Sequence, residues 1–136
     1  MAGLLHDVDY ETTNADPARH GLEGAALLEE IGLDEQLVHA VKVHSGHLPA
    51  SSTLDWALFA TDPLTGLIVA SALMHPEKKL SVLDVDFVLR RFKEKRFAAG
   101  ANREQIATSK NLGLELNEFM EICLEGMQEI AGDLGL

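Results

Sequence analysis

The clearest helical pattern of the chain lies at residues 116–134, which read LNEFMEICLEGMQEIAGDL. Apolar side chains recur there every three or four residues, at Leu116, Phe119, Cys123, Met127, Ile130 and Leu134. This spacing places them on one face of an α-helix, because the helix has 3.6 residues per turn. The pattern therefore predicts an amphipathic helix whose apolar face is buried against the rest of the chain.

Helical signals recur upstream, and no stretch sustains the alternation that is typical of a strand. Asp16 and Asp34 each precede an apolar helical pattern and are good N-cap residues. Pro63 lacks an N–H donor and predicts a kink or a restart within its helix. The sequence predicts an all-α fold, a single helical domain over residues 1–136. Its helices are expected at residues 16–31, 34–44, 54–73, 85–97, 102–113 and 116–134.

Length and composition limit the class of protein. The chain has 136 residues, 46% of them hydrophobic, which is enough for one domain with a core. The single cysteine, Cys123, excludes an internal disulfide and a cysteine-based metal motif. We expect no membrane partner, since no apolar run approaches the roughly 20 residues that a membrane span needs. These features favour a cytoplasmic protein.

Charge is distributed unevenly along the chain. The net charge of −11 argues against a nucleic-acid partner, because binding nucleic acid needs a basic surface. Residues 78–110 nevertheless hold nine of the 11 basic residues and four of the 22 acidic ones. This segment is either a solvated helix face with weak ion pairs or an attractor for an anionic substrate or an acidic partner.

A histidine and an aspartate are adjacent near the start of the chain, at His6 and Asp7. An imidazole and a carboxylate at the end of one helix can both reach a single divalent ion. Three later residues could join them: His20 near a helix start, His44 on an apolar helix face, and Asp62 in an apolar stretch. Fe, Mn, Co and Ni accept such mixed ligands, and Mg accepts the carboxylates.

Each of the three later residues also has a structural explanation. Taken alone, His20 is more often a surface residue, and His44 a neutral core histidine with one hydrogen bond. Asp62 precedes a proline and is a natural N-cap. Only the order and spacing of the whole set favour a metal site over these explanations.

That order and spacing resemble the ligand series of the HD superfamily of metal-dependent phosphohydrolases. The series is His-Asp after an apolar Gly-Leu-Leu, then two histidines, then an aspartate on a later helix. Further segments look like a bacterial and archaeal subfamily of HD hydrolases: AGLLHDVDYE (2–11), HGLEGAALLEEIGL (20–33), DPLTGLIV (62–69), KKL (78–80) and FKEKRFAAGANREQ (92–105). The resemblance covers essentially the whole chain and implies an HD-domain-like helical bundle around a metal site.

The resemblance also implies roles for individual residues. Asp7 would be the central metal ligand and the catalytic residue, with His6 and Asp62 on the first metal. His20 and His44 match the positions that bind a second metal. The implied reaction is hydrolysis of a small phosphorylated compound or nucleotide by metal-activated water. Three cations in subfamily-like segments could bind the substrate phosphate: Lys78, Lys79 and Arg103.

The chain departs from the superfamily pattern at its start. HD hydrolases normally begin with a helix that supplies a further histidine ligand, whereas this sequence starts inside the second helix. We therefore expect an N-terminally truncated bundle whose incomplete site binds its divalent metal weakly or not at all. Without the first helix, part of the core should be exposed, and such an apolar patch predicts a homodimer or larger homo-oligomer. Three interpretations stay open: a phosphohydrolase, a degenerate HD domain that acts as a non-catalytic binding or assembly module, and part of a longer protein.

Overall fold

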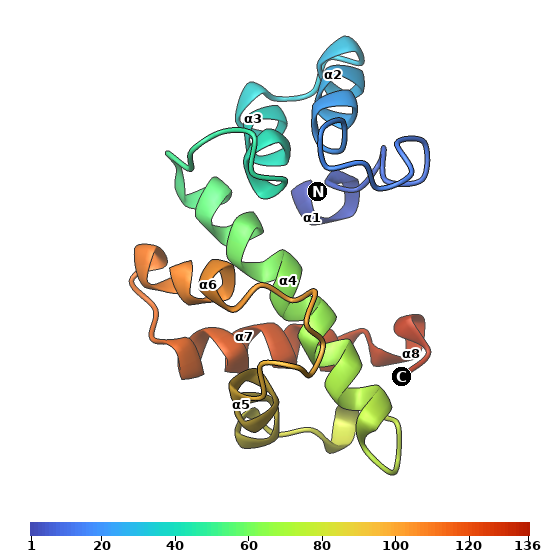
Figure 1. The fold of residues 1–136 in the computed structure, drawn as a ribbon, viewed down its shortest axis with the longest axis vertical. Coiled ribbons are helices and arrows are strands. Elements are labelled where there is room, and N and C mark those ends of the chain that lie inside the picture. Colours follow the sequence, from blue (N-terminus) through green and yellow to red (C-terminus); the bar gives the residue numbers. More distant parts are fainter. The chain divides into compact units, whose positions relative to one another are not determined.

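The computed structural model describes residues 1–136 and contains helices but no strand, which confirms the all-α prediction (Figure 1). The chain divides into two compact units, Met1–Phe59 and Ala60–Leu136. The predicted single domain stays a prediction. In chain order the elements are α1 (Ala2–Leu5), α2 (Leu22–Glu30), α3 (Glu35–His44), α4 (Thr53–Met74), η1 (Leu80–Val82), α5 (Val85–Lys93), α6 (Arg103–Ile106), η2 (Ala107–Leu112), α7 (Leu116–Glu129) and α8 (Ala131–Leu134), where η marks a 3-10 helix.

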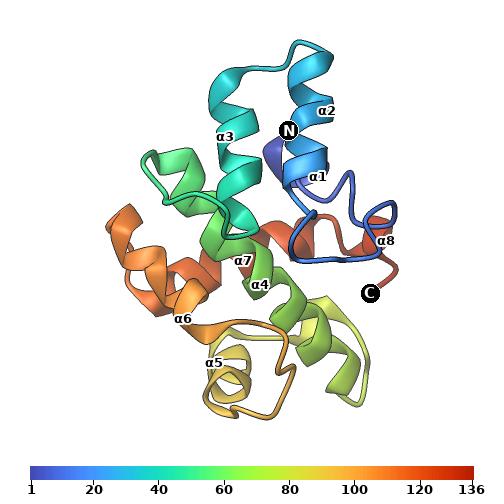
Figure 2. The same cartoon turned by 45° about the horizontal axis from the view of Figure 1, so that its top comes forward.

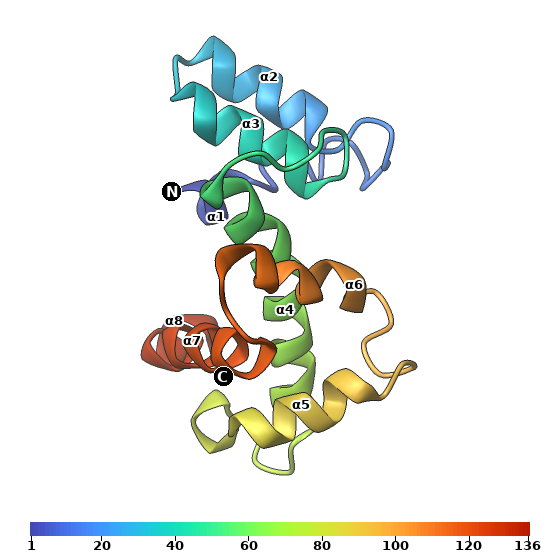
Figure 3. The same cartoon turned by 90° about the vertical axis from the view of Figure 1, so that its left-hand side faces the viewer.

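Helices α2 and α3 pack side by side in the first unit (Figures 1 and 3). Asp34 caps α3 as predicted, because its side chain accepts a hydrogen bond from the Gln36 N–H. The short helix α1 contacts α3. The core between these helices is made of apolar side chains: Ala25, Leu28, Leu37, Val38 and Val41. This packing holds the end of α1 and the end of α3 in one unit.

The segment between α1 and α2 is a series of turns rather than the start of a helix (Figure 2). Asp16 accepts a hydrogen bond from the Ala18 N–H, but α2 begins only at Leu22. The reason is Gly21, whose φ of +79° is left-handed and incompatible with a continuing right-handed helix. His20 therefore lies in a turn just before α2, and not in the first turn of a helix.

The second unit has its own core, in which α5 and α7 are packed together (Figure 3). Leu64, Leu67 and Ile68 of α4 are fully buried in it. The predicted apolar face at residues 116–134 is buried along α7, but the helix breaks at Ile130, where φ is −106°. The expected single helix is therefore two, and Ile130 and Leu134 are exposed.

Helix α4 bears on two expectations. It is continuous through Pro63, so the helix does not restart there. It is also 22 residues long, and is by length and composition able to cross a membrane. One such helix is weak evidence, because buried core helices pass the same test, and α4 supplies core side chains to the second unit. The cytoplasmic location stays a prediction.

Candidate metal centre

Three of the predicted ligands converge in the first unit: Asp7, His20 and His44. Their ligand atoms all lie within 4.8 Å of one another. The Nε2 atoms of His20 and His44 are 3.2 Å apart. Asp7 Oδ1 lies 3.3 Å from Nε2 of His20 and 3.6 Å from Nε2 of His44. His44 is buried and the Asp7 side chain is about half exposed, so the cluster opens toward solvent on the carboxylate side.

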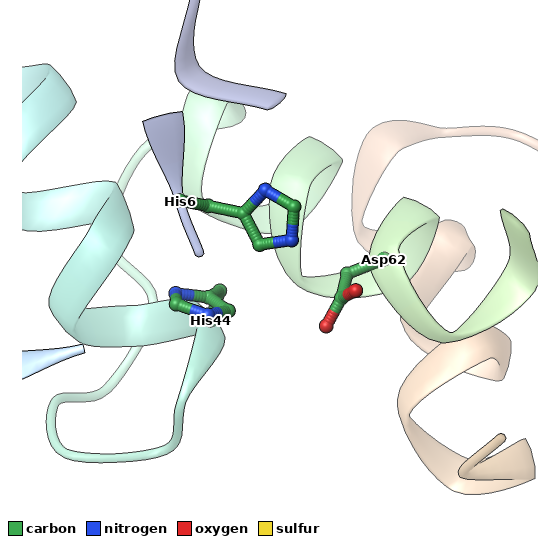
Figure 4. Close-up of side chains that lie close together, drawn as sticks. All are labelled: His6, His44 and Asp62. Carbon is green, nitrogen blue, oxygen red and sulfur yellow. The ribbon is translucent and has the colours of Figure 1, made fainter. Parts of the chain in front are cut away.

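His6 lies close to Oδ2, the second carboxylate oxygen of Asp7. Its Nε2 is 3.3 Å from Asp7 Oδ2. Figure 4 shows the rings of His6, which directly follows α1, and His44, the last residue of α3. Their ring centroids are 4.9 Å apart with the planes nearly perpendicular. The two oxygens of Asp7 therefore face different imidazoles, as a bridging carboxylate would require.

The Nδ1 partners assign the tautomers of the three histidines. His44 Nδ1 donates to the Val41 carbonyl, and His6 Nδ1 donates to the Gly3 carbonyl at 2.9 Å. A carbonyl can only accept, so the proton must sit on Nδ1 in both rings. His20 Nδ1 bonds to Asp9 Oδ1 at 2.8 Å, and an ionised carboxylate likewise requires the proton on Nδ1. In the neutral form of each ring, the lone pair therefore belongs to Nε2, the nitrogen that faces Asp7.

Asp9, which orients His20, was missed at the level of sequence. It is buried and also accepts hydrogen bonds from the N–H groups of Gly21 (2.8 Å) and Gly24 (2.6 Å) at the start of α2. Burial alone would raise the pKa of Asp9, but the bonds from Gly24, His20 and Gly21 together lower it below its ordinary value. The carboxylate is thus ionised and fixes the ring of His20.

Two glycines make room for this arrangement. A Cβ on Gly24 would lie 3.0 Å from Cγ of Asp9, and a Cβ on Gly21 would lie 2.0 Å from Oγ of Ser45. The carboxylate therefore occupies the space beside Gly24 that a side chain would otherwise fill. The available signal in the sequence was an aspartate two residues after Asp7 together with glycines three apart at a helix start.

The remaining predicted residues lie in the second unit, and their roles stay predictions. Asp62, also drawn in Figure 4, belongs to α4 beyond the boundary between the units. Lys78 and Lys79 are exposed in the turn between α4 and η1.

The structure gives Arg103 a structural contact that the sequence did not suggest. Its guanidinium donates to the backbone carbonyls of Arg91, Phe92, Glu94, Phe97, Ala98 and Ala101. It thereby holds together the end of α5 and the loop that follows. The substrate-binding role predicted for Arg103 stays a prediction.

The converging atoms fit a divalent metal ion. Three acceptors, two imidazole nitrogens and one carboxylate oxygen, point at one another, which is unfavourable unless a cation or a proton lies among them. Metal–nitrogen bonds of about 2.0–2.1 Å place two ligand nitrogens about 2.8–3.4 Å apart, from the octahedral to the tetrahedral angle. The 3.2 Å between the Nε2 atoms of His20 and His44 lies in this range.

Comparison with known proteins finds partial similarities. No family model and no solved structure matches the chain. An uncharacterized protein of Methanocaldococcus jannaschii is 27% identical over 125 residues, which is 89% of this chain and 71% of that protein. Ribonuclease Y of Oleidesulfovibrio alaskensis and of Frankia casuarinae are 32% and 34% identical over 65 residues, or 48% of this chain. These matches span 12% and 10% of the two ribonucleases.

Proposed function

We propose that this chain is a metal-dependent phosphohydrolase of the HD superfamily that acts on a small phosphorylated compound. The observation that carries the proposal is the convergence of Asp7 Oδ1 with Nε2 of His20 and of His44, all within 4.8 Å. The partial matches to ribonuclease Y support an HD-like domain. The order of histidines and aspartates along the chain agrees with this assignment.

Each residue of the cluster has a defined task in the proposal. Asp7 and the Nε2 atoms of His20 and His44 hold a divalent ion, with His6 on the second carboxylate oxygen. When bound, such an ion polarises a phosphoryl oxygen and makes water acidic enough to act as a nucleophile near neutral pH. Asp9 keeps the proton of His20 on Nδ1, so that Nε2 stays available as a ligand. The exposed side of Asp7 leaves the cluster open to a substrate.

The test combines metal analysis with hydrolysis. Protein purified without chelators is analysed for Mn, Fe, Co and Ni, and is then assayed with phosphomonoesters, nucleotides and a short RNA. We expect bound metal and turnover of the small esters, both abolished in Asp7→Ala. Glu11→Ala, which removes an exposed carboxylate from the same segment, is the matched control and keeps both.

Two outcomes would contradict the proposal. A protein that stays inert toward every ester after metal addition is not a phosphohydrolase. If it still binds metal through Asp7, it fits the alternative of a non-catalytic binding module. Turnover that survives Asp7→Ala would show that the activity belongs to another site or to a contaminant.

Self-association stays a prediction at this stage. Leu4 on α1 is 84% exposed and Val8 is 43% exposed, so the first unit presents large apolar side chains to its surroundings. Light scattering at micromolar concentration tests it. We expect a dimer or larger assembly, and a stable monomer would refute the prediction.

A further inference from the structure

An apolar cavity of 280 Å³ lies within the first unit, among the end of α3, the loop after it and the first turns of α4. Its walls include Val43, Leu48, Pro49, Trp56 and Phe59. None of the side chains that line it carries a charge or a hydroxyl group. Ligand pockets usually range from about 300 to 1,000 Å³, so this one suits a single ring system better than a whole nucleotide.

Two aromatic side chains, Trp56 and Phe59, form part of the cavity wall. Trp56 and Phe59 are three residues apart on α4 and therefore lie on one face of the helix. Their ring centroids are 6.4 Å apart and the planes meet at 81°, an edge-to-face arrangement. Both side chains are half-buried, so parts of both rings remain accessible. Accessible aromatic faces are stacking surfaces for planar ligands.

The cavity and the metal centre are built from the same short stretch of chain. Val43 lines the cavity and directly precedes His44, and Gly46 lines it two residues after His44. Consecutive Cα atoms are about 3.8 Å apart, so both wall residues have their Cα within about 8 Å of that of His44. His47, in the same loop, donates from Nε2 to the His20 carbonyl at 2.9 Å. This bond ties the loop that carries Gly46 and Leu48 to a second residue of the centre.

We propose that this cavity binds a planar aromatic group of the phosphate ester whose phosphate is hydrolysed at Asp7, His20 and His44. The inference rests on the proposed function and adds the class of substrate: phosphate esters that carry an aromatic ring, such as a phenyl group or a nucleobase. Trp56 is the stacking residue, and Phe59 and Leu48 complete the apolar walls.

The kinetic test uses the manganese-loaded full chain with two esters of different shape. Replacing Trp56 by alanine raises the KM for phenyl phosphate about tenfold, because loss of one stacking partner typically costs this much binding. The KM for glycerol 3-phosphate, which has no ring, changes less than about twofold. Trp56→Phe restores most of the affinity for phenyl phosphate. Equal changes for both esters would overturn the proposal.

A binding test separates this inference from the proposed function. Trp56 is the single tryptophan of the chain, so intrinsic fluorescence reports directly on the cavity. Phenyl phosphate should quench it saturably in the wild type and in Asp7→Ala, whereas n-hexyl phosphate should not match its affinity. Quenching without any hydrolysis would support binding of an aromatic group in the cavity and would refute the proposed phosphohydrolase activity. Hydrolysis without saturable quenching, or equal affinity for the hexyl ester, would refute aromatic binding in the cavity and leave the proposed phosphohydrolase activity standing.

Discussion

The first unit contains two histidine–aspartate pairs of the same local design, and only one of them belongs to a candidate metal centre. His20 Nδ1 lies 2.8 Å from Asp9, and His39 Nδ1 lies 3.0 Å from Asp55. Each aspartate is buried and accepts two backbone N–H bonds, from Gly21 and Gly24 or from Ser51 and Ser52. Both carboxylates therefore orient an imidazole and tie down the backbone at a helix start.

The difference lies in what faces the other ring nitrogen. Nε2 of His20 meets Asp7 and the Nε2 of His44. The ring of His39 instead lines an open cavity together with Glu35, Gln36, Ser51 and Ser52. A buried carboxylate behind a histidine is thus a structural device that occurs in both places. A metal centre arises only where further ligands converge on the opposite nitrogen.

Asp55 also has a complete structural role of its own. Its N–H donates to Ser52 Oγ, and its carboxylate accepts from the Ser52 N–H. This reciprocal pair is a capping box at the start of α4. The His39 bond joins α3 to that cap. The pair can therefore be explained by the fold, whereas the cluster around His20 presents three acceptor atoms to one another.

The largest difference between the pairs is expected in metal affinity. Asp9→Asn removes the charge that orients His20, and loss of such an outer carboxylate typically lowers metal affinity about 10–100-fold. Asp55→Asn, the matched substitution in the other pair, leaves the affinity unchanged. Calorimetric titration with Mn²⁺ measures both variants. Equal losses would mean that both substitutions act through general destabilisation.

The next largest effect is expected for Asp55→Asn, on the free energy of unfolding and its dependence on pH. Burial alone would raise the pKa of Asp55, but the bonds from the Ser51 N–H, His39 and the Ser52 N–H lower it below 3.8. A lowered pKa adds stability that is complete above pH 4 or so and is lost as the pH falls through the folded pKa. At pH 6, Asp55→Asn should cost about 2 kcal/mol, because buried donors lose a charged acceptor.

Urea unfolding at pH 6 and at pH 3 measures this dependence. The gap between the wild type and Asp55→Asn should shrink at pH 3, because this pH lies below the ordinary pKa of an aspartate and the unfolded wild-type chain takes up a proton there. A gap that is independent of pH would show that ionisation of Asp55 contributes nothing to folding.

The smallest effect is expected for His39. His39→Gln removes one partly exposed ring but leaves Asp55 its bonds from the two serine N–H groups. The free energy of unfolding should fall by about 1 kcal/mol, the net contribution of one hydrogen bond. Chemical denaturation measures it. A loss of several kcal/mol would show that His39 contributes more to folding than the single hydrogen bond that joins α3 to the start of α4.

The sequence predicted those parts of the fold that depend on neighbouring residues. Asp34 caps α3, and the periodic stretch at 116–129 forms α7. These features involve residues three or four positions apart, which propensity and spacing describe well. The order of the ligands along the chain likewise indicated Asp7, His20 and His44 as members of one cluster.

The features that escaped prediction depend on long-range contacts. Asp9 lies 15 residues before Gly24, and the bond between them depends on turns that have no periodicity. The left-handed Gly21 delays α2, although Asp16 and Pro17 favour an earlier start. Arg103 donates hydrogen bonds to backbone carbonyls of residues 91–101. Helix α5 therefore ends at Lys93, although the apolar pattern predicts a helix to residue 97. In each case a tertiary hydrogen bond or a backbone conformation overrides a local preference.

We propose that His20, and not His39, directs its Nε2 into a divalent metal centre. The most direct measurement is a Mn²⁺ titration of the wild type, His20→Gln and His39→Gln, because each variant removes a ring held by a buried aspartate. We predict saturable binding to the wild type, a loss of at least about tenfold in His20→Gln and an unchanged affinity in His39→Gln. Equal affinities for the two variants, or no binding to the wild type, would show that His20 is not a metal ligand.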